Sequence, residues 1–402
     1  MRLLFIADGR SPTALNWIAY FLEQGDEVHL VSTFPSPADP RLASFTFIPV
    51  AFSALKQTPS QSSVAASRSA RSLWGAPALR LRTLARHWLG PLTLSRAAQR
   101  LRAVLDQIQP DLLHAMRIPY EGMLASIAVG AVGAGPRPAH ARHAPLLLSV
   151  WGNDFTLHAP STPLMRHYTC LALHAASALH ADCQRDLRLA QKWGFDPAKP
   201  AIVLPGAGGV QLDLFFPPAV PVAGPLVINP RGIRVYVNNS AFFQSIPLVL
   251  RRQPQARFLC PAMAGEPQAL RWLDELHIAG NVELLPFQSR PQMAELFRRS
   301  RIAISPATHD GTPNTLLEAM ACGCVPVAGD LESLREWITP GQNGLLVDPN
   351  DPQSIAQGLL AALEDDALQQ RARAQNAGLI AGRAEYGSVM RSAQAFYRLL
   401  VG

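Results

Sequence analysis

The sequence predicts an α/β protein made of two doubly wound domains, each with a parallel sheet. Short β-rich runs alternate with helical patterns along the whole chain, which is typical of parallel strands joined by crossover helices. The series restarts after the proline-rich stretch FFPPAVPVAGP, and 402 residues are too many for one ordinary core. We therefore expect four parts: a first domain at 1–216, a linker at 217–224, a second domain at 225–385 and a last, amphipathic helix at 386–402.

The expected strands are short apolar runs, because strands of a parallel sheet are buried on both faces. In the first domain they are LLFIA (3–7), VHLVS (28–32), FTFIPV (45–50), LLHA (112–115), LLLSVWG (146–152), ALHADC (178–183) and AIVLPG (201–206). In the second domain they are LVINP (226–230), ARFLCP (256–261), VELLPF (282–287), IAISPA (302–307), VPVAGD (325–330) and GLLVDP (344–349). Helical patterns fill the intervals.

Composition narrows the classes of protein. No apolar run approaches the roughly 20 residues that a spanning helix needs, and MRLLFIADGRSP lacks the small-residue cleavage site of a signal peptide. We therefore expect a cytoplasmic protein. The five cysteines contain no CxxC pair, so we expect no metal or redox site.

The net charge of +7 suits a nucleic acid, an anionic membrane or a phosphorylated substrate, and its distribution favours the membrane. No acidic residue lies between Asp39 and Asp106, whereas eight arginines lie within residues 68–102: Arg68, Arg71, Arg80, Arg82, Arg86, Arg96, Arg100 and Arg102. Tryptophans and leucines at near-helical spacing lie among them, so residues 68–102 are predicted to contact an anionic bilayer rather than a nucleic acid. A helix pair packed on the core, with solvated arginines, accounts for the pattern equally well.

Ligands of doubly wound sheets bind beyond the carboxyl ends of the strands. After the first strand the chain reads ADGRSPTALNW, without a GxGxxG fingerprint, and the second strand does not end in an acidic residue. A dinucleotide oxidoreductase is therefore disfavoured. The GAGG at 206–209 leads into VQLDLFFPP rather than an amphipathic helix, so we interpret it as a hinge.

The stretch DGTPNTLLEAMACG (310–323) reads as a loop that leads into a helix just after an expected strand. Thr312 is a candidate N-cap with Pro313 in the first turn, and Thr315 with Glu318 fits a capping box equally well. Its place after strand 302–307 puts the helix N-terminus at the ligand-binding edge of the sheet.

Four stretches in order resemble the retaining glycosyltransferases of family 4, which have the GT-B fold. They are GVQLDLFFP (209–217), INPRGIR (228–234), SPATHDGTPNTLLEAMACGCVPV (305–327) and GQNGLLVDPNDP (341–352). The resemblance implies two Rossmann-like domains that face each other across a cleft. It also implies that the C-terminal helix returns to the first domain.

On the donor side, the resemblance assigns roles by position. Glu318 corresponds to the carboxylate that takes the ribose hydroxyls of a sugar nucleotide. Asp310 stands where the family usually has a glutamate and is expected to reach a hydroxyl of the donor sugar. The sugar and distal phosphate are expected beside the segment made of Gly311, Thr312, Pro313, Asn314, Thr315 and Leu316.

The diphosphate is expected on Arg231, because a planar guanidinium can hold two oxygens at once. The family usually has a lysine a few residues further on, whereas this chain has Tyr236, Val237 and Asn238 there. Arg234 is the expected substitute for that lysine.

On the acceptor side, Gly9 and Arg10 occupy the loop after the first strand and are expected to face the cleft. HAMRIPYEG (114–122) is similar to the family's HAH stretch, which makes His114 a candidate; a satisfied core histidine is the alternative. VWGND (150–154) is similar to its HG.D segment, with Trp151 in place of histidine. Asp154 is either a site residue or the cap of the next helix.

The resemblance implies a transferase that moves a sugar from a UDP- or GDP-linked donor to a glycan, lipid or small-molecule acceptor with retention of configuration. It implies no cofactor and no metal, and we expect a role in cell-envelope or lipid-linked glycan synthesis, at the inner face of the plasma membrane. Two alternatives stay open: a GT-B binding or scaffold protein that has lost transfer, and a GT-B enzyme acting on free sugar nucleotides. A pyridoxal-dependent phosphorylase is excluded, since no lysine follows Lys199.

Overall fold

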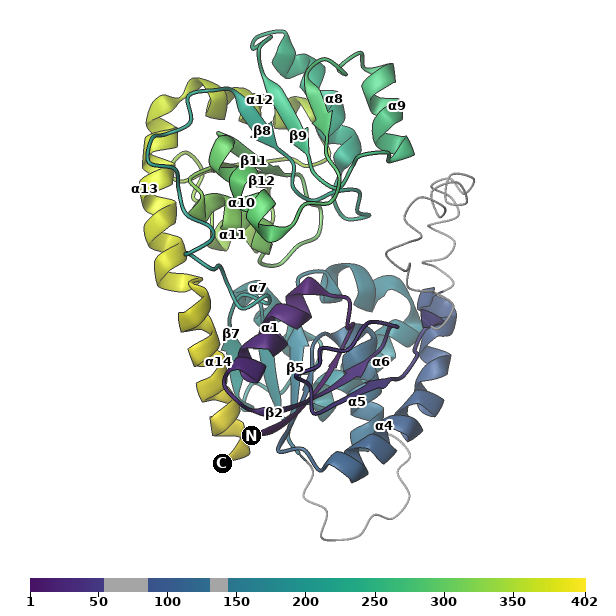
Figure 1. The fold of residues 1–402 in the computed structure, drawn as a ribbon. Helices are drawn as coiled ribbons and strands as arrows, with labels where there is room; N and C mark the ends of the chain where they lie inside the picture. The colour runs from purple at the N-terminus through teal and green to yellow at the C-terminus, as the bar shows by residue number, and fades with distance from the viewer. Residues whose placement is uncertain (54–85, 131–143) are drawn as a thin grey trace. The chain divides into compact units, whose positions relative to one another are not determined.

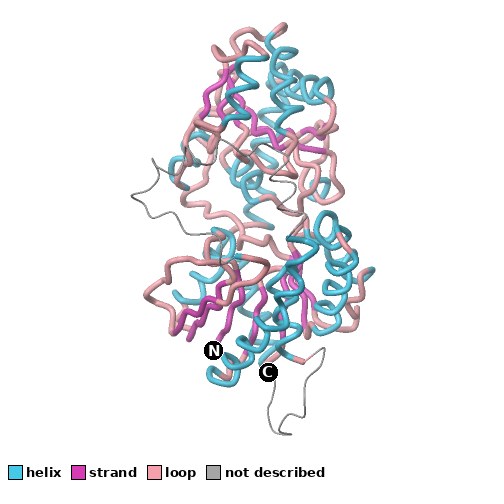
Figure 2. Tube along the Cα trace, turned by 90° about the vertical axis from the view of Figure 1, so that its right-hand side faces the viewer, coloured by secondary structure: helices cyan, strands magenta, loops and turns pink. Residues whose placement is uncertain are grey.

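The computed structural model describes residues 1–53, 86–130 and 144–402. They form two compact units, Met1–Gly208 together with Met390–Gly402, and Gly209–Val389. Each unit contains one parallel sheet with helices packed around it, as Figures 1 and 2 show. The predicted fold class is therefore confirmed.

The first unit has a seven-stranded parallel sheet in the order β3-β2-β1-β4-β5-β6-β7. The strands are β1 (Arg2–Ala7), β2 (Glu27–Ser32), β3 (Ser44–Phe47), β4 (Leu112–Ala115), β5 (Leu146–Val150), β6 (Ala178–Ala181) and β7 (Ala201–Val203). All seven predicted strands are present, and the buried apolar runs explain why they were recognisable. The strand order reverses between β1 and β4, which makes their carboxyl ends the expected place for a ligand.

The described helices of this unit connect the strands. They are α1 (Pro12–Glu23), α4 (Leu94–Ile108), α5 (Met123–Val129), α6 (Pro163–Ala175) and α7 (Gln184–Lys192), with the shorter turns η3 (Gly90–Thr93), η4 (Ile118–Gly122), η5 (Asp154–His158) and η6 (Ala159–Ser161). Helix α1 begins as its sequence dictates: Ser11 accepts a hydrogen bond from the backbone NH of Ala14, and Pro12 occupies the first turn.

The last helix, α14 (Tyr386–Val401), contributes its residues from Met390 onward to the first unit. It is anchored there by a buried polar chain. Tyr397 Oη accepts a hydrogen bond from Trp17 Nε1 at 2.9 Å and pairs with His114 Nδ1. His114 Nε2 pairs with Ser149 Oγ at 2.7 Å, and Ser149 Oγ with His180 Nδ1 at 2.8 Å. Burial lowers the pKa of both histidines, to about 4 for His180, so both rings are neutral.

The second unit has a six-stranded parallel sheet in the order β10-β9-β8-β11-β12-β13. Its strands are β8 (Leu226–Ile228), β9 (Arg257–Cys260), β10 (Val282–Leu284), β11 (Ile302–Ser305), β12 (Val325–Gly329) and β13 (Leu345–Val347). Its helices are α8 (Asn239–Leu250), α9 (Pro267–Glu275), α10 (Arg290–Arg299), α11 (Asn314–Ala321), α12 (Pro352–Glu364) and α13 (Asp366–Arg383), with the turn η7 (Leu334–Glu336). Here the strand order reverses between β8 and β11.

The segment that follows Gly208 belongs to the second unit, although the sequence placed the end of the first domain at residue 216. Val210 explains this difference. Its NH donates to the carbonyl of Ala384 at 2.7 Å, and its carbonyl accepts from the NH of Tyr386 at 2.9 Å. Gly209 has a positive φ of 91°, and a Cβ there would lie 2.3 Å from the Ala384 carbonyl oxygen, so only glycine fits.

Candidate functional site

The central contact of the second unit joins the carboxyl ends of its two innermost strands. Arg231 follows β8 and Asp310 follows β11, and Arg231 Nη1 lies 2.8 Å from Asp310 Oδ2. Both side chains are largely buried, with exposed fractions of 9% and 15%. The structure thus brings two of the predicted donor-site residues together at the point where the strand order reverses.

Both members of this pair are held by further contacts. Asp310 Oδ1 accepts from the NH of Gly311 at 3.1 Å, and the Asp310 carbonyl accepts from Ser333 Oγ at 2.7 Å. The Arg231 guanidinium lies 5.6 Å from the ring centre of Tyr236. Burial, the largest single effect, lowers the pKa of Arg231, but Asp310 and Tyr236 together outweigh it, so the pKa is raised and the guanidinium is a fixed cation.

Arg234, the expected substitute for the family's lysine, is exposed. Its Nε donates to the Arg231 carbonyl at 2.9 Å, and its Nη1 donates to Tyr236 Oη at 3.4 Å. Tyr236 is itself fixed, because its carbonyl accepts from the NH of Thr308 at 2.9 Å. Arg234 therefore lies beside Arg231, and Tyr236 contacts both arginines.

The helix after Asp310 begins differently from the prediction. Its N-cap is Pro313, which makes no side-chain capping bond, so neither the Thr312 cap nor the Thr315–Glu318 capping box forms. Thr312 Oγ1 instead accepts from Trp337 Nε1 at 3.2 Å. Among the described residues, no side chain caps the backbone NH groups of Asn314 and Thr315 at the start of α11, whereas the NH of Leu316 donates to the Pro313 carbonyl at 2.9 Å.

The carboxylate of Glu318, on α11, accepts hydrogen bonds from two side chains. Asn314 Nδ2 donates to Glu318 Oε1 at 3.0 Å, and Arg290 Nη2 donates to the same oxygen at 3.3 Å. Glu318 is 7% exposed, and its burial raises its pKa to about 7 despite these two partners. A carboxylate held this way is poised between its charged and neutral forms.

Arg290 is the residue of this site that sequence reasoning missed. It begins α10, 28 residues before Glu318, and its guanidinium lies 5.4 Å from the ring centre of Phe215. Its side chain is 38% exposed, so it contacts Glu318 and solvent together. The one feature that could have indicated Arg290 as a site residue is its position after β10, at the carboxyl edge of the same sheet.

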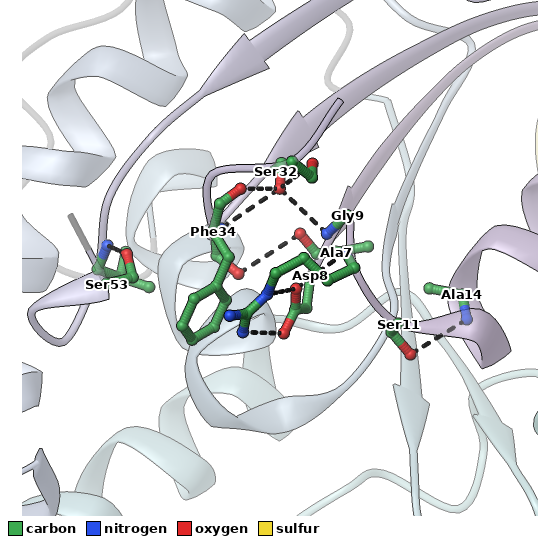
Figure 3. A network of polar contacts seen from close by, with 12 residues as sticks. Ala7, Asp8, Gly9, Ser11, Ala14, Ser32, Phe34 and Ser53 are labelled. Carbon is green, nitrogen blue, oxygen red and sulfur yellow. Dashed lines mark hydrogen bonds and ion pairs between the residues drawn. The ribbon is translucent and has the colours of Figure 1, made fainter. Parts of the chain in front are cut away.

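In the first unit, the loop after β1 packs tightly against the end of β2. The NH of Gly9 donates to Ser32 Oγ at 3.0 Å (Figure 3). A Cβ at position 9 would lie 2.2 Å from Ser36 Oγ. Arg10 folds back onto Asp8 with contacts of 2.9 and 2.8 Å. Its guanidinium lies 3.7 Å from the ring centre of Phe34.

Asp154 is buried at the carboxyl end of β5. Its Oδ2 accepts from the NH groups of Trp151 at 3.1 Å and Ile118 at 3.2 Å, and its Oδ1 contacts Arg117 Nη2 at 3.3 Å. Burial raises its pKa and the Arg117 charge lowers it, with burial the larger effect. Trp151 Nε1 is buried without a hydrogen-bond partner among the described residues. Asp154 therefore ties the ends of β4 and β5 together instead of capping the next helix.

His114 lies inside β4, not at its end, and 1% of it is exposed. Both its ring nitrogens are occupied, by Tyr397 and by Ser149. Of the two roles weighed for it, the structure favours the core histidine, and we leave it out of the site proposed below.

Asp182, Cys183 and Asp186 place possible metal ligands within 4.8 Å of one another in the described part of the chain. Arg185 Nη2 already contacts Asp186 Oδ1 at 2.6 Å, so a cation would compete with a guanidinium there. Burial also raises the pKa of Cys183, which disfavours the thiolate that a metal needs. We interpret Arg185 and Asp186 as a buried ion pair that positions α7.

Comparison with known families covers most of the chain. The model described as "Glycosyl transferase 4-like domain" matches residues 8–206, and the model described as "Glycosyl transferases group 1" matches residues 238–378. The D-inositol 3-phosphate glycosyltransferase of Mycolicibacterium paratuberculosis is 28% identical over 214 residues, which are 50% of this chain and 48% of that protein. The chain thus spans about half the length of this curated relative.

Solved structures are similar over their whole length. Sucrose-phosphate synthase from Thermosynechococcus elongatus superimposes with a TM-score of 0.73 at 14% identity, covering 100% of this chain and 99% of the other. HepE of Anabaena in complex with UDP and glucose superimposes with a TM-score of 0.68 at 14% identity, covering 98% and 99%. At this identity the likeness shows the fold, which is that of GT-B glycosyltransferases.

Proposed function

Since the chain belongs to the glycosyltransferases that these two family models describe, we propose that it moves a sugar from a nucleoside diphosphate sugar to an acceptor hydroxyl with retention of configuration. The observation that carries the proposal is the convergence, at the carboxyl edge of the second sheet, of Arg231, Asp310 and Glu318 with the uncapped N-terminus of α11. This edge offers cationic groups and two carboxylates within one unit, which suits a ligand with a diphosphate and several hydroxyls.

The carboxylate of Glu318 suits the ribose. An ionised carboxylate only accepts hydrogen bonds, and two vicinal hydroxyls can donate to its two oxygens. Oε2 is the oxygen that neither Asn314 nor Arg290 contacts through the hydrogen bonds described above. Arg290, half-exposed beside it, would then border the nucleoside.

The diphosphate would lie between Arg231 and the first turn of α11. A guanidinium has five NH donors, so Arg231 can keep its contact with Asp310 and still bind phosphate oxygens. The helix N-terminus adds partial positive charge and bare NH groups. When the sugar–phosphate bond breaks, negative charge grows on the diphosphate, and fixed donors of this kind stabilise it without rearrangement.

Asp310 would hold a hydroxyl of the donor sugar. Its Oδ1 takes the NH of Gly311, and its Oδ2 faces Arg231, so its orientation is set before the donor arrives. Arg234, fixed to the Arg231 carbonyl, would supply the second positive charge that the family's lysine usually provides.

The nucleobase is proposed to be uracil or guanine, and UDP is the first to test because HepE binds UDP. We propose that the acceptor belongs to cell-envelope or lipid-linked glycan synthesis. It would bind the first unit at the carboxyl edge of its sheet, where Gly9, Arg10, Trp151 and Asp154 lie.

An exposed apolar surface on the first unit supports a membrane-bound acceptor. It consists of Phe52, Trp88, Leu89 and Leu92, which are 44%, 52%, 49% and 66% exposed. The NH of Ala51 donates to Thr93 Oγ1 at 2.9 Å, which brings the two segments together.

Exposed Arg96 follows this apolar surface on α4, and aromatic and leucine side chains beside arginine favour the interface of an anionic bilayer. No helix in the described ranges is long and apolar enough to cross a membrane. Residues 68–85 of the predicted basic segment lie outside the described residues.

The proposal is tested by incubating the protein with a panel of UDP- and GDP-sugars and following release of the nucleoside diphosphate. With an active donor, NMR of the glycoside formed gives its anomeric configuration. We expect release with at least one donor and a product that keeps the donor's configuration. Binding of a donor without release or transfer would instead support the scaffold alternative.

A further inference from the structure

The first unit contains a guanidinium that has no counter-ion among the described residues. Near the carboxyl ends of β1, β2 and β4, Arg10 pairs with Asp8, and Arg117 pairs with Asp154. Arg86 forms no ion pair with any described residue, and its Nε is buried without a hydrogen-bond partner among them. A desolvated cation in this state is costly unless an anion joins it.

The surroundings of Arg86 hold it in place. Its guanidinium lies 4.8 Å from the ring centre of Tyr120 and 5.3 Å from that of Phe34. Tyr120 Oη donates to the Arg86 carbonyl at 2.7 Å, so the tyrosine fixes the backbone as well as the side chain. Burial lowers the pKa of Arg86, and the neighbouring charge of Arg117 adds to this effect. The guanidinium charges of Arg86 and Arg117 thus both act on this part of the first unit.

The buried residue Glu121 acts electrostatically on Arg86. Glu121 is 3% exposed, its Oε1 accepts from Thr33 Oγ1 at 2.6 Å, and its Oε2 has no hydrogen-bond partner among the described residues. Its charge acts on Arg86, yet the two residues form no ion pair. Glu121 therefore moderates the positive charge at Arg86 without satisfying its donors.

We propose that Arg86 binds a phosphate group carried by the acceptor, with Tyr120 and Phe34 orienting the guanidinium and Glu121 setting the strength of the attraction. This inference rests on the proposed function, because it names the chemical class of the acceptor. Phosphate suits the place because a dianion matches two nearby cations and because a planar guanidinium can bind two of its oxygens. The phosphate belongs to either a soluble phosphorylated polyol or sugar, or a lipid.

The test uses the full chain without nucleotide and glycerol 3-phosphate as the probe, titrated by calorimetry. We expect saturable binding by the wild type, a loss of at least about tenfold in Arg86→Gln, and little change in Arg100→Gln, an exposed arginine of the same unit. Arg86→Lys keeps the positive charge and serves as a second variant in case Arg86→Gln misfolds. It should bind glycerol 3-phosphate more tightly than Arg86→Gln does. Equal affinity of the wild type and Arg86→Gln would overturn the proposal.

A second variant distinguishes recognition from structural damage. Glu121→Gln removes a negative charge while keeping the shape and an acceptor for Thr33, so the probe should bind more tightly than to the wild type. Weaker binding in this variant would contradict the role given to Glu121.

Vesicles separate the two sources of phosphate. Phosphatidic acid carries a phosphate monoester, whereas phosphatidylglycerol is anionic without one, and a lipid acceptor predicts an Arg86-dependent preference for the former. Wild-type protein that binds neither glycerol 3-phosphate nor phosphatidic acid would defeat the inference. UDP binding, measured on the same sample, reports on the proposed function separately.

Discussion

Arg231 Nη1 lies 2.8 Å from Asp310 Oδ2, so a cation and a carboxylate from two adjacent strands meet where the strand order of the second sheet reverses. In the proposed mechanism the two residues serve different parts of one donor. Arg231 holds the diphosphate, and Asp310 holds the sugar.

Asp310→Asn should leave UDP affinity unchanged or slightly higher, because the substitution removes a negative charge beside the proposed diphosphate site. Sugar transfer should fall by roughly a hundredfold, since the sugar is no longer held in its reactive position. Calorimetry with UDP and a transfer assay with the active donor check the two parts. The matched control is Asp330→Asn, which removes a carboxylate from the exposed Arg335–Asp330 pair of the same unit. A parallel loss of both UDP binding and transfer in Asp310→Asn would count against the assignment.

Arg231→Lys should weaken UDP binding by about tenfold, because an ammonium lacks the planar fork that holds two phosphate oxygens. Uridine binding should stay within about twofold of the wild type, because the nucleoside carries no phosphate for this arginine. Titrations of both ligands against the variant test this selectivity. If uridine is lost to the same extent as UDP, Arg231 supports the fold of the site rather than the diphosphate.

Glu318 should make stability depend on pH. Its pKa is near 4.5 in the unfolded chain and about 7 in the folded protein, so the folded state binds the proton more tightly. Stability relative to Glu318→Gln should therefore be highest below pH 4.5, decline as the pH rises toward about 7, and then level off, with a total change of about 3 kcal/mol.

Urea unfolding of both proteins across this range measures that difference. Glu295→Gln, at a half-exposed position on α10, is the control for replacing a glutamate of this unit with glutamine. A difference between wild type and Glu318→Gln that does not change with pH would contradict the raised pKa.

Replacing Trp88 and Leu92 with serine should reduce co-sedimentation with vesicles that contain phosphatidylglycerol. Both side chains are more than half exposed, so their removal should cost bilayer contact with little effect on folding. Leu270→Ser is the control, because this leucine is 50% exposed on α9 of the second unit. Unchanged binding of the double variant would remove the apolar surface as a membrane contact.

Sequence patterns predicted the framework well, because strands buried on both faces must be continuous apolar runs. LLHA at 112–115 matches β4 residue for residue, and all thirteen predicted strands occur in the described chain. The start of α11 was predicted wrongly: Thr312, Thr315 and Glu318 have the spacing of caps, but the chain folds so that Asn314 and Arg290 take the carboxylate.

Local spacing in the sequence could not predict the contacts between side chains that come from different segments of the sheet. Arg290 lies 28 residues from Glu318 in sequence, and nothing in its own segment indicates that partner. For His114 the sequence left two roles open, because a histidine in an apolar strand fits either a functional site or a buried hydrogen-bond network. Its hydrogen bond with Tyr397, near the other end of the chain, favours the buried network.

We propose that the carboxyl edge of the second sheet binds a nucleoside diphosphate through Glu318 and its neighbours. Thermal-shift measurements with UDP, GDP, ADP, CDP and dTDP, on the wild type and on Glu318→Gln, test it most directly, because a ligand that binds only the folded state raises the unfolding temperature. We expect UDP or GDP to raise this temperature in the wild type and to raise it much less in the variant. No shift with any nucleotide, or equal shifts in both proteins, would contradict it.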